Sequence, residues 1–155
     1  MFDVPIDGWY AWLGVAAVSV LALGLTTTLP SAPPPEAAPA AEAIDRTAAS
    51  DHEATAEIPV DARQIHLGRH QIGLRNDAGT AHASLAYGPV VSSRSDPRLE
   101  AVLHGESPAR AFESEAAFGE TIATTRAAEP DWKPVEGPIL VRRVFWGDVD
   151  VTLVG

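Results

Sequence analysis

Residues 9–29 read WYAWLGVAAVSVLALGLTTTL, a run of 21 residues without a charged side chain. A helix rises about 1.5 Å per residue, so this run reaches roughly 31 Å, about the thickness of the hydrocarbon core of a bilayer. Trp9, Tyr10 and Trp12 stand at its beginning, and aromatic rings gather at the headgroup level of membranes. The stretch therefore predicts a single membrane-spanning helix behind a short N-terminal tail, residues 1–8.

The segment after the predicted span is rich in proline and alanine. Five prolines fall between Pro30 and Pro39, and a proline-rich chain favours an extended, polyproline-like conformation. We expect an extended stalk over residues 30–56, although residues 40–50 are also compatible with a short alanine-rich helix. Residues 57–155 then remain as one small head domain, because roughly 100 residues can bury one core and not two.

The first hairpin of the head is predicted between residues 70–75 and 80–85, around a turn that begins at Asn76. Pairing Arg75 with Thr80 collects the apolar side chains on one face of this pair and the polar ones on the other. A half-buried antiparallel pair requires this separation. Short strands are also expected around Ile65 and over residues 89–92.

The second hairpin is predicted at the end of the sequence. Gly147 and Asp148 suit a two-residue type II′ turn, which pairs Trp146 with Val149. This register makes Arg143 and Asp150 diagonal neighbours on a polar face. The expected apolar face consists of Leu140, Val144, Trp146, Val149, Val151 and Leu153.

Short helices are expected between the two hairpins. Asp96 followed by Pro97 is a helix-start signal, which Ser107 and Pro108 repeat, and residues 114–128 are compatible with a further helix. The prolines between 130 and 138 argue against regular structure there. The predicted fold class is α+β: one transmembrane helix, a stalk, and a small β-rich head with short helices.

Composition limits the partners. The formal net charge is -10, so the surface repels phosphate backbones and we expect no nucleic-acid partner. Cysteine is absent, which excludes disulfides and thiolate metal sites. Lys133 is the single lysine among eleven basic residues. This bias is typical of a GC-rich genome or, together with the acid excess, of adaptation to molar salt.

No motif predicts catalytic, cofactor-binding or metal-binding residues. His66 and His70 have the spacing of two helical metal ligands and His82 follows, but the intervening sequence is not helical. A serine-rich loop, with Ser92, Ser93 and Ser95, lacks a positioned histidine. Trp132, which stands between prolines, is either a binding-surface aromatic or a plug at the edge of a small core.

The whole pattern resembles an uncharacterised family of small single-pass membrane proteins from halophilic archaea. The resemblance lies in the tail, span and stalk and in three sequence runs: LRNDAGTAHA at 74–83, YGPV at 87–90 and WGDVDVTLVG at 146–155. It implies an association with type IV pilus or Tad-like secretion machinery. No catalytic residue is implied, because these runs are turn and strand sequences.

The plan also resembles that of archaeal pilins, an apolar N-terminal helix followed by a β-rich head. The match fails at the expected cleavage site, where Gly8 follows Ile6 and Asp7 in place of a basic residue. No glutamate occurs early in the apolar run either. Processing and assembly like those of a pilin are therefore not implied.

The leading hypothesis is a non-enzymatic, single-pass envelope protein, an accessory or pilin-like component of a surface appendage or secretion apparatus. Its head is expected outside the cell membrane, although Arg46, the basic residue nearest the span, leans weakly toward a cytoplasmic head. Its expected partners are the lipid bilayer and other envelope proteins.

Two alternatives remain open. One is a membrane-tethered module that binds a solute or protein ligand, through Trp132 and the face around Phe145. The other is a metal-dependent enzyme that uses the three histidines, His66, His70 and His82.

Overall fold

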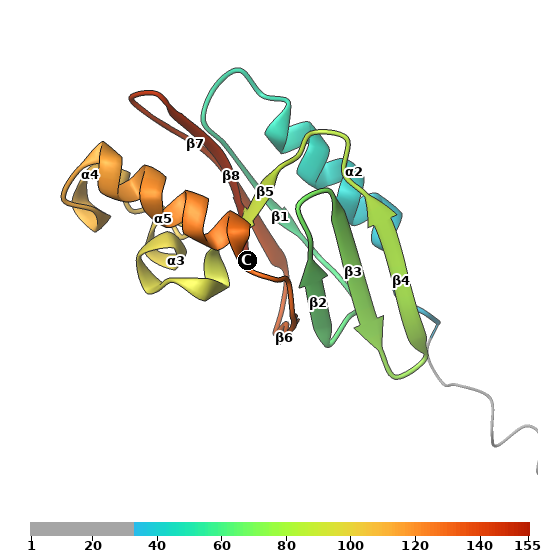
Figure 1. Cartoon of the computed structure of the whole chain (residues 1–155). Helices are drawn as coiled ribbons and strands as arrows, with labels where there is room; N and C mark the ends of the chain where they lie inside the picture. Colours follow the sequence, from blue (N-terminus) through green and yellow to red (C-terminus); the bar gives the residue numbers. More distant parts are fainter. Residues whose placement is uncertain (1–32) are drawn as a thin grey trace, which may run out of the picture. The chain divides into compact units, whose positions relative to one another are not determined.

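Two four-stranded β-sheets form the framework of the computed structural model, which describes residues 33–155 (Figure 1). The strand orders are β1-β7-β8-β5, called here the β7 sheet, and β4-β3-β2-β6, called the β3 sheet. The described elements are α2 (Ala37–Ala48), β1 (Ala54–Ile58), β2 (Gln64–Leu67), β3 (Gln71–Asn76), β4 (Gly79–Ser84), β5 (Val90–Ser92), the 3₁₀ turn η1 (Ser93–Ser95), α3 (Pro97–Leu103), α4 (Pro108–Ala111), α5 (Glu115–Ala127), β6 (Trp132–Pro134), β7 (Ile139–Trp146) and β8 (Val149–Val154). An α+β fold with two sheets and short helices is confirmed.

The first predicted hairpin is present as β3 and β4. Arg75 pairs with Thr80 and Leu74 with Ala81, which is the register expected from the alternation of apolar and polar residues. The side chain of Asn76 holds the turn, because its oxygen accepts hydrogen bonds from the N–H groups of Ala78 and Gly79. The pairing continues to Gly79, so the connecting loop is shorter than expected.

The second predicted hairpin is present as β7 and β8. Trp146 pairs with Val149, and the Arg143 guanidinium lies 2.7 Å from the Asp150 carboxylate across the two strands. Gly147 has a φ of +58°. Within residues 33–155 no residue other than glycine has a positive φ, so Asp148, the second residue of the turn, has a negative one. A type II′ turn requires this combination.

The β7 sheet is buried on both faces. The apolar face expected for the β7–β8 hairpin packs on α3, α4 and α5 through Leu99, Phe112 and Phe118. The opposite face, expected to be polar, is also buried toward one end, through Ile139, Val141, Thr152 and Val154. The face expected to be polar is buried there because a second layer, α2 and the β3 sheet, covers it.

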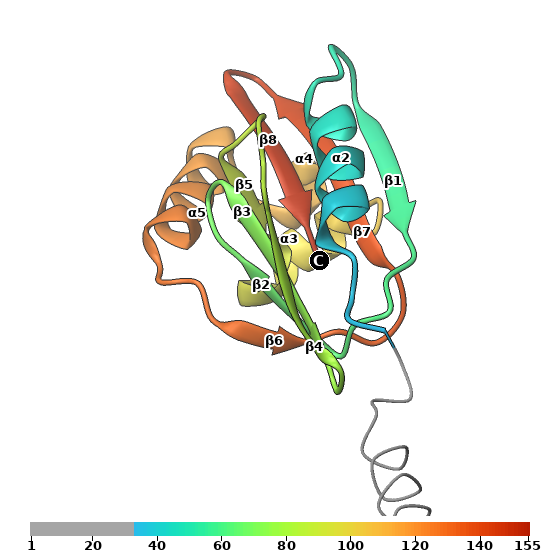
Figure 2. The same cartoon turned by 90° about the vertical axis from the view of Figure 1, so that its right-hand side faces the viewer.

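The segment expected as an extended stalk over residues 30–56 is helical from Ala37 to Ala48 and belongs to the fold. The head therefore does not begin at residue 57. One face of α2 is buried, with Ala40 and Ile44 at its centre, and packs against both sheets (Figure 2). Pro39 is tolerated because the first-turn N–H groups of a helix have no partner within the helix.

The prolines between 130 and 138 were expected to exclude regular structure, and this expectation was wrong. Trp132 to Pro134 form β6, in which Trp132 pairs with His66 of β2. The strand lies at the edge of the β3 sheet, where one side of the backbone has no strand to bond. An edge strand accommodates proline.

The helix-start signals are confirmed at three helices. Asp96 and Ser114 accept hydrogen bonds at the starts of α3 and α5, and Pro108 is the first residue of α4. No helix within residues 33–155 combines the length and the apolarity needed to cross a bilayer. The predicted tail at 1–8 and span at 9–29 lie outside the described residues.

Candidate functional site

The three histidines singled out in the sequence do not form one cluster. His66 on β2 and His82 on β4 both pair with Gly73 of β3, so they lie on the same open face of the β3 sheet. His70 precedes β3 and lies against Gly88. Within residues 33–155 no three histidine, cysteine, aspartate or glutamate side chains come close enough to share a metal ion.

Trp132 lies on the same open face and is already covered by its neighbours. The Arg75 guanidinium lies 4.0 Å from the centre of the indole ring, and the rings of His66 and His82 lie 5.3 and 6.0 Å away. A β-carbon at Gly73 would lie 3.1 Å from the indole, so the ring also covers the backbone there. Trp132 is therefore packed onto the sheet and is not a free binding platform.

The other sequence candidates also have structural contacts. The Ser93 hydroxyl is buried and donates to the carbonyl oxygen of Val154 at 3.4 Å. Phe145 lies beneath the Arg143 guanidinium, 4.9 Å from ring centre to guanidinium carbon. Ser93 also borders a hollow that Arg94, Glu100 and His104 line.

A pocket of about 270 Å³ lies elsewhere, between β2, β5, β6 and the end of α5. Figure 1 shows these elements converging near the C-terminus of the chain. Buried aliphatic side chains form its floor, among them Ile65 and Val154 of one apolar cluster and Val91 of the other. The pocket thus lies where the two apolar clusters of the core meet.

Basic side chains line this pocket: Arg69, Arg94, Arg126 and Lys133. They come from the β2–β3 loop, η1, α5 and β6, respectively. The ion pairs formed within residues 33–155 all use other arginines. Two acidic residues, Glu129 and Asp131, line the rim, so four positive charges against two negative ones leave the lining at +2. We call it the basic pocket.

The arginines of the basic pocket bond to backbone carbonyls and keep unused donors. Arg69 Nε donates to the carbonyl oxygen of Arg126 at 2.9 Å, and Arg94 Nη1 donates to that of Pro134. The Nε atoms of Arg94 and Arg126 are buried and lack a hydrogen-bond partner. A buried guanidinium N–H without an acceptor is costly. The anion-binding capacity of the pocket therefore rests on the positive charge of the basic side chains that line it.

Burial changes the pKa of the Arg126 guanidinium. Desolvation lowers the pKa of its guanidinium from the ordinary value, because burial disfavours the charged form, while the Asp150 carboxylate opposes this shift. An arginine stays protonated despite such a shift. Arg126 therefore offers a charge that is partly stripped of water and that takes part in none of the ion pairs formed within residues 33–155.

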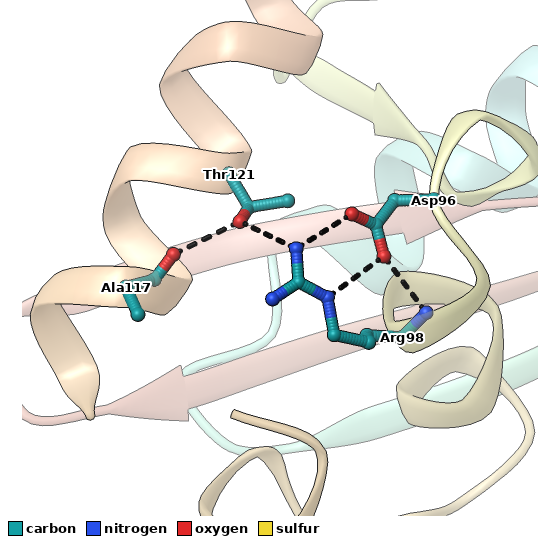
Figure 3. A network of polar contacts seen from close by, with 4 residues as sticks. All are labelled: Asp96, Arg98, Ala117 and Thr121. Atoms are coloured by element: carbon teal, nitrogen blue, oxygen red, sulfur yellow. Dashed lines mark hydrogen bonds and ion pairs between the residues drawn. The ribbon is translucent and has the colours of Figure 1, made fainter. Parts of the chain in front are cut away.

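A polar network joins α3 to α5, the helix that carries Arg126 (Figure 3). Arg98 of α3 donates to both carboxylate oxygens of Asp96, at 2.9 and 3.2 Å, and to the hydroxyl of Thr121 on α5 at 3.4 Å. Thr121 in turn donates to the Ala117 carbonyl at 2.9 Å. The network ties the start of α3, next to Arg94, to the helix that carries Arg126.

Of the candidate residues singled out in the sequence, Ser92 and Ser95 line the basic pocket, whereas none of its four basic residues was predicted to form a site. Arg69 and Lys133 are 64 positions apart, and no local pattern marks either of them. The one available signal was the preference for arginine in an acidic chain, which we attributed to composition. The convergence of these residues depends on the tertiary fold.

Comparisons with curated proteins and with solved structures found no match to this chain. A family profile, by contrast, matches residues 3–144, which is most of the sequence. The expectation of an uncharacterised family is therefore confirmed, whereas no comparison bears on its predicted association with halophilic archaea or pili. The chain belongs to the family of unknown function DUF7283.

Proposed function

We propose that this protein is a non-enzymatic binding module whose head holds an anionic ligand in the basic pocket. The observation that carries the proposal is the convergence of four basic side chains, none of them in an ion pair within residues 33–155. Two acidic residues of the lining, Glu129 and Asp131, offset only half of that positive charge. Charge-assisted hydrogen bonds from guanidinium groups are among the strongest that a protein offers to an anion.

The net charge of the whole chain favours binding of an anion at this pocket over binding elsewhere on the surface. The formal net charge is -10, so most of the surface repels anions. Four of the eleven basic residues nevertheless line one hollow. The basic pocket therefore attracts an anion, although the rest of the surface repels it.

We propose no reaction for this protein, on the basis of the polar contacts of the described residues. No hydrogen bond within residues 33–155 joins a histidine side chain to a hydroxyl group, the pairing that activates a serine or threonine nucleophile. The basic pocket supplies positive charge and an apolar floor, which suit retention of a ligand. We therefore propose binding without turnover.

The test is isothermal titration of the full-length protein in detergent with acetate, hexanoate and inorganic phosphate. We expect at least one of these anions to bind, and the Arg94→Gln and Arg126→Gln variants to bind it about tenfold to hundredfold more weakly. A hydrogen bond to a charged group contributes about 1.5–3 kcal/mol, which corresponds to that range. Arg126→Gln keeps the backbone carbonyl that Arg69 uses.

The matched control is Arg110→Gln, which removes an exposed arginine outside the pocket. Its affinity should equal that of the unmodified protein, and added salt should weaken binding to both. Equal losses in all three variants would show a general charge effect and contradict a site in the basic pocket. Absence of binding by every anion would contradict the proposed function itself.

Membrane attachment through residues 9–29 is part of the proposal and is supported by the uncharged sequence alone. We expect the full-length protein in the membrane pellet after lysis without detergent, and release from it by detergent. Recovery in the supernatant would contradict the tether. The accessory role in a surface appendage or secretion apparatus stays a prediction from the resemblance, to be checked by cross-linking in native membranes.

A further inference from the structure

We infer that the ligand of the basic pocket is a monocarboxylate with an apolar tail. This inference rests on the proposed function and names the chemical class of the anion. It follows from three properties of the pocket: the apolar floor, the guanidinium groups in the lining and the volume.

The floor is apolar and already dehydrated. Ile65, Val90, Val91 and Val154 line the pocket, and each is at most 4% exposed. Leu67 adds a half-buried aliphatic surface. Because these side chains expose almost no surface to water, the gain comes from the ligand, whose hydrocarbon leaves water when it lies against the floor, at roughly 25 cal/mol for each Å² buried.

Arg94 and Arg126 bring two planar guanidinium groups to the lining of the same hollow. A guanidinium matches the planar carboxylate with two parallel hydrogen bonds. Phosphate would also accept from these donors, because the two anions share that chemistry. Phosphate carries no hydrocarbon, however, and would leave the aliphatic floor uncovered.

The volume limits the size of the tail. One water molecule occupies about 30 Å³ of the liquid, so a pocket of about 270 Å³ accommodates roughly nine non-hydrogen atoms of similar size. Hexanoate, with eight such atoms, fits within the pocket, whereas the tail of a long-chain fatty acid would extend beyond it. The ligand is thus a short aliphatic or a small aromatic carboxylate.

The experiment compares acetate, butanoate and hexanoate with inorganic phosphate and hexanol, by titration of the full-length protein in detergent. We expect affinity to rise about fourfold for each added methylene group, which corresponds to about 0.8 kcal/mol. Hexanol should bind at least tenfold more weakly than hexanoate, because it cannot pair with the arginines. Phosphate should also bind more weakly than hexanoate.

Two variants separate the tail from the carboxylate. Ser92→Leu fills part of the pocket with a larger side chain and should weaken hexanoate while leaving acetate nearly unchanged. Leu67→Ala removes apolar lining at a half-buried position and should reduce the gain per methylene group. Thermal unfolding of each variant establishes that it is folded, and Leu67→Ala serves as the test if Ser92→Leu is not.

The outcomes distinguish this inference from the proposed function. Phosphate binding that is tighter than hexanoate binding and is lost in Arg126→Gln would overturn the carboxylate inference and keep the anion site. Hexanoate affinity that is the same in Arg94→Gln, Arg126→Gln and the unmodified protein would show partition into detergent and overturn the inference. Absence of any anion binding would overturn both.

Discussion

Asp96 performs two tasks with one carboxylate. It caps α3 by accepting the N–H of Arg98 at 2.8 Å, and it pairs with the guanidinium of the same residue at 2.9 Å. The hydrogen bond from the Arg98 side chain is the main reason that the pKa of Asp96 lies below its ordinary value of 3.8. Because the pKa is lower in the folded state, the stabilisation is complete above the unfolded-state pKa and is lost as the pH falls through the folded-state pKa.

We predict that Asp96→Ala lowers the free energy of unfolding by about 1 kcal/mol at neutral pH, the usual cost of a lost N-cap. Asp96→Asn keeps an acceptor for the cap and loses only the charge, so it should cost less. Urea unfolding monitored by tryptophan fluorescence measures both. The difference between Asp96→Asn and the unmodified protein should shrink between pH 7 and about pH 3. A constant difference over that range would contradict this account.

At the scale of the elements, the β7–β8 turn is held from outside its own hairpin. A Glu115 carboxylate oxygen, at the first turn of α5, accepts the N–H of Asp148 at 2.6 Å. A β-carbon placed on Gly147 would lie 1.9 Å from the other oxygen of that carboxylate. Glycine is therefore required at this position by the backbone conformation, and a β-carbon there would also displace the Glu115 carboxylate, the end of a flexible side chain.

We predict that Gly147→Ala destabilises the protein by about 1–3 kcal/mol, because alanine is strained at this φ and displaces Glu115. Gly119→Ala is the matched control, since its β-carbon would lie 3.5 Å from Val149, an ordinary contact, within α5. Alanine is favoured over glycine in a helix by about 0.5–1 kcal/mol. Chemical denaturation should therefore show opposite signs, and equal losses would refute this explanation.

At the scale of the whole molecule, α2 connects the two sheets. Ile44 is fully buried, and the α2 face that carries it belongs to the apolar cluster that includes Ile72 and Val141, one from each sheet. Asp45, on the same helix, accepts the N–H groups of Ala86 and Tyr87 at 3.0 Å each, where the chain passes from β4 toward β5. The helix is therefore an integral layer of the head and not a spacer.

We predict that Ile44→Ala costs about 2–4 kcal/mol of unfolding free energy, the usual range for a truncated core side chain. Glu42→Ala, at an exposed position of the same helix, is the control and should change stability by less than about 0.5 kcal/mol. Urea unfolding of the full-length protein in detergent provides the measurement. An Ile44→Ala variant as stable as the control would restore the interpretation of this segment as a stalk.

The sequence by itself determined the parts of the fold that depend on neighbouring residues. The registers of β3–β4 and β7–β8 were predictable because a turn and the alternation of side chains specify both together. Asp96 and Ser114 likewise marked the starts of α3 and α5, since a cap bonds only to the next few N–H groups.

Only the tertiary structure decided whether α2 is buried, whether residues 132–134 join a sheet, and which charges meet. A stripe of small alanines becomes a core face only when two sheets cover it, and a proline-bordered segment becomes a strand only beside an open edge. Arg69, Arg94, Arg126 and Lys133 lie on separate elements, and each looks like an ordinary surface cation in the sequence. Their convergence is set by the packing of distant elements, which no local preference of the chain encodes.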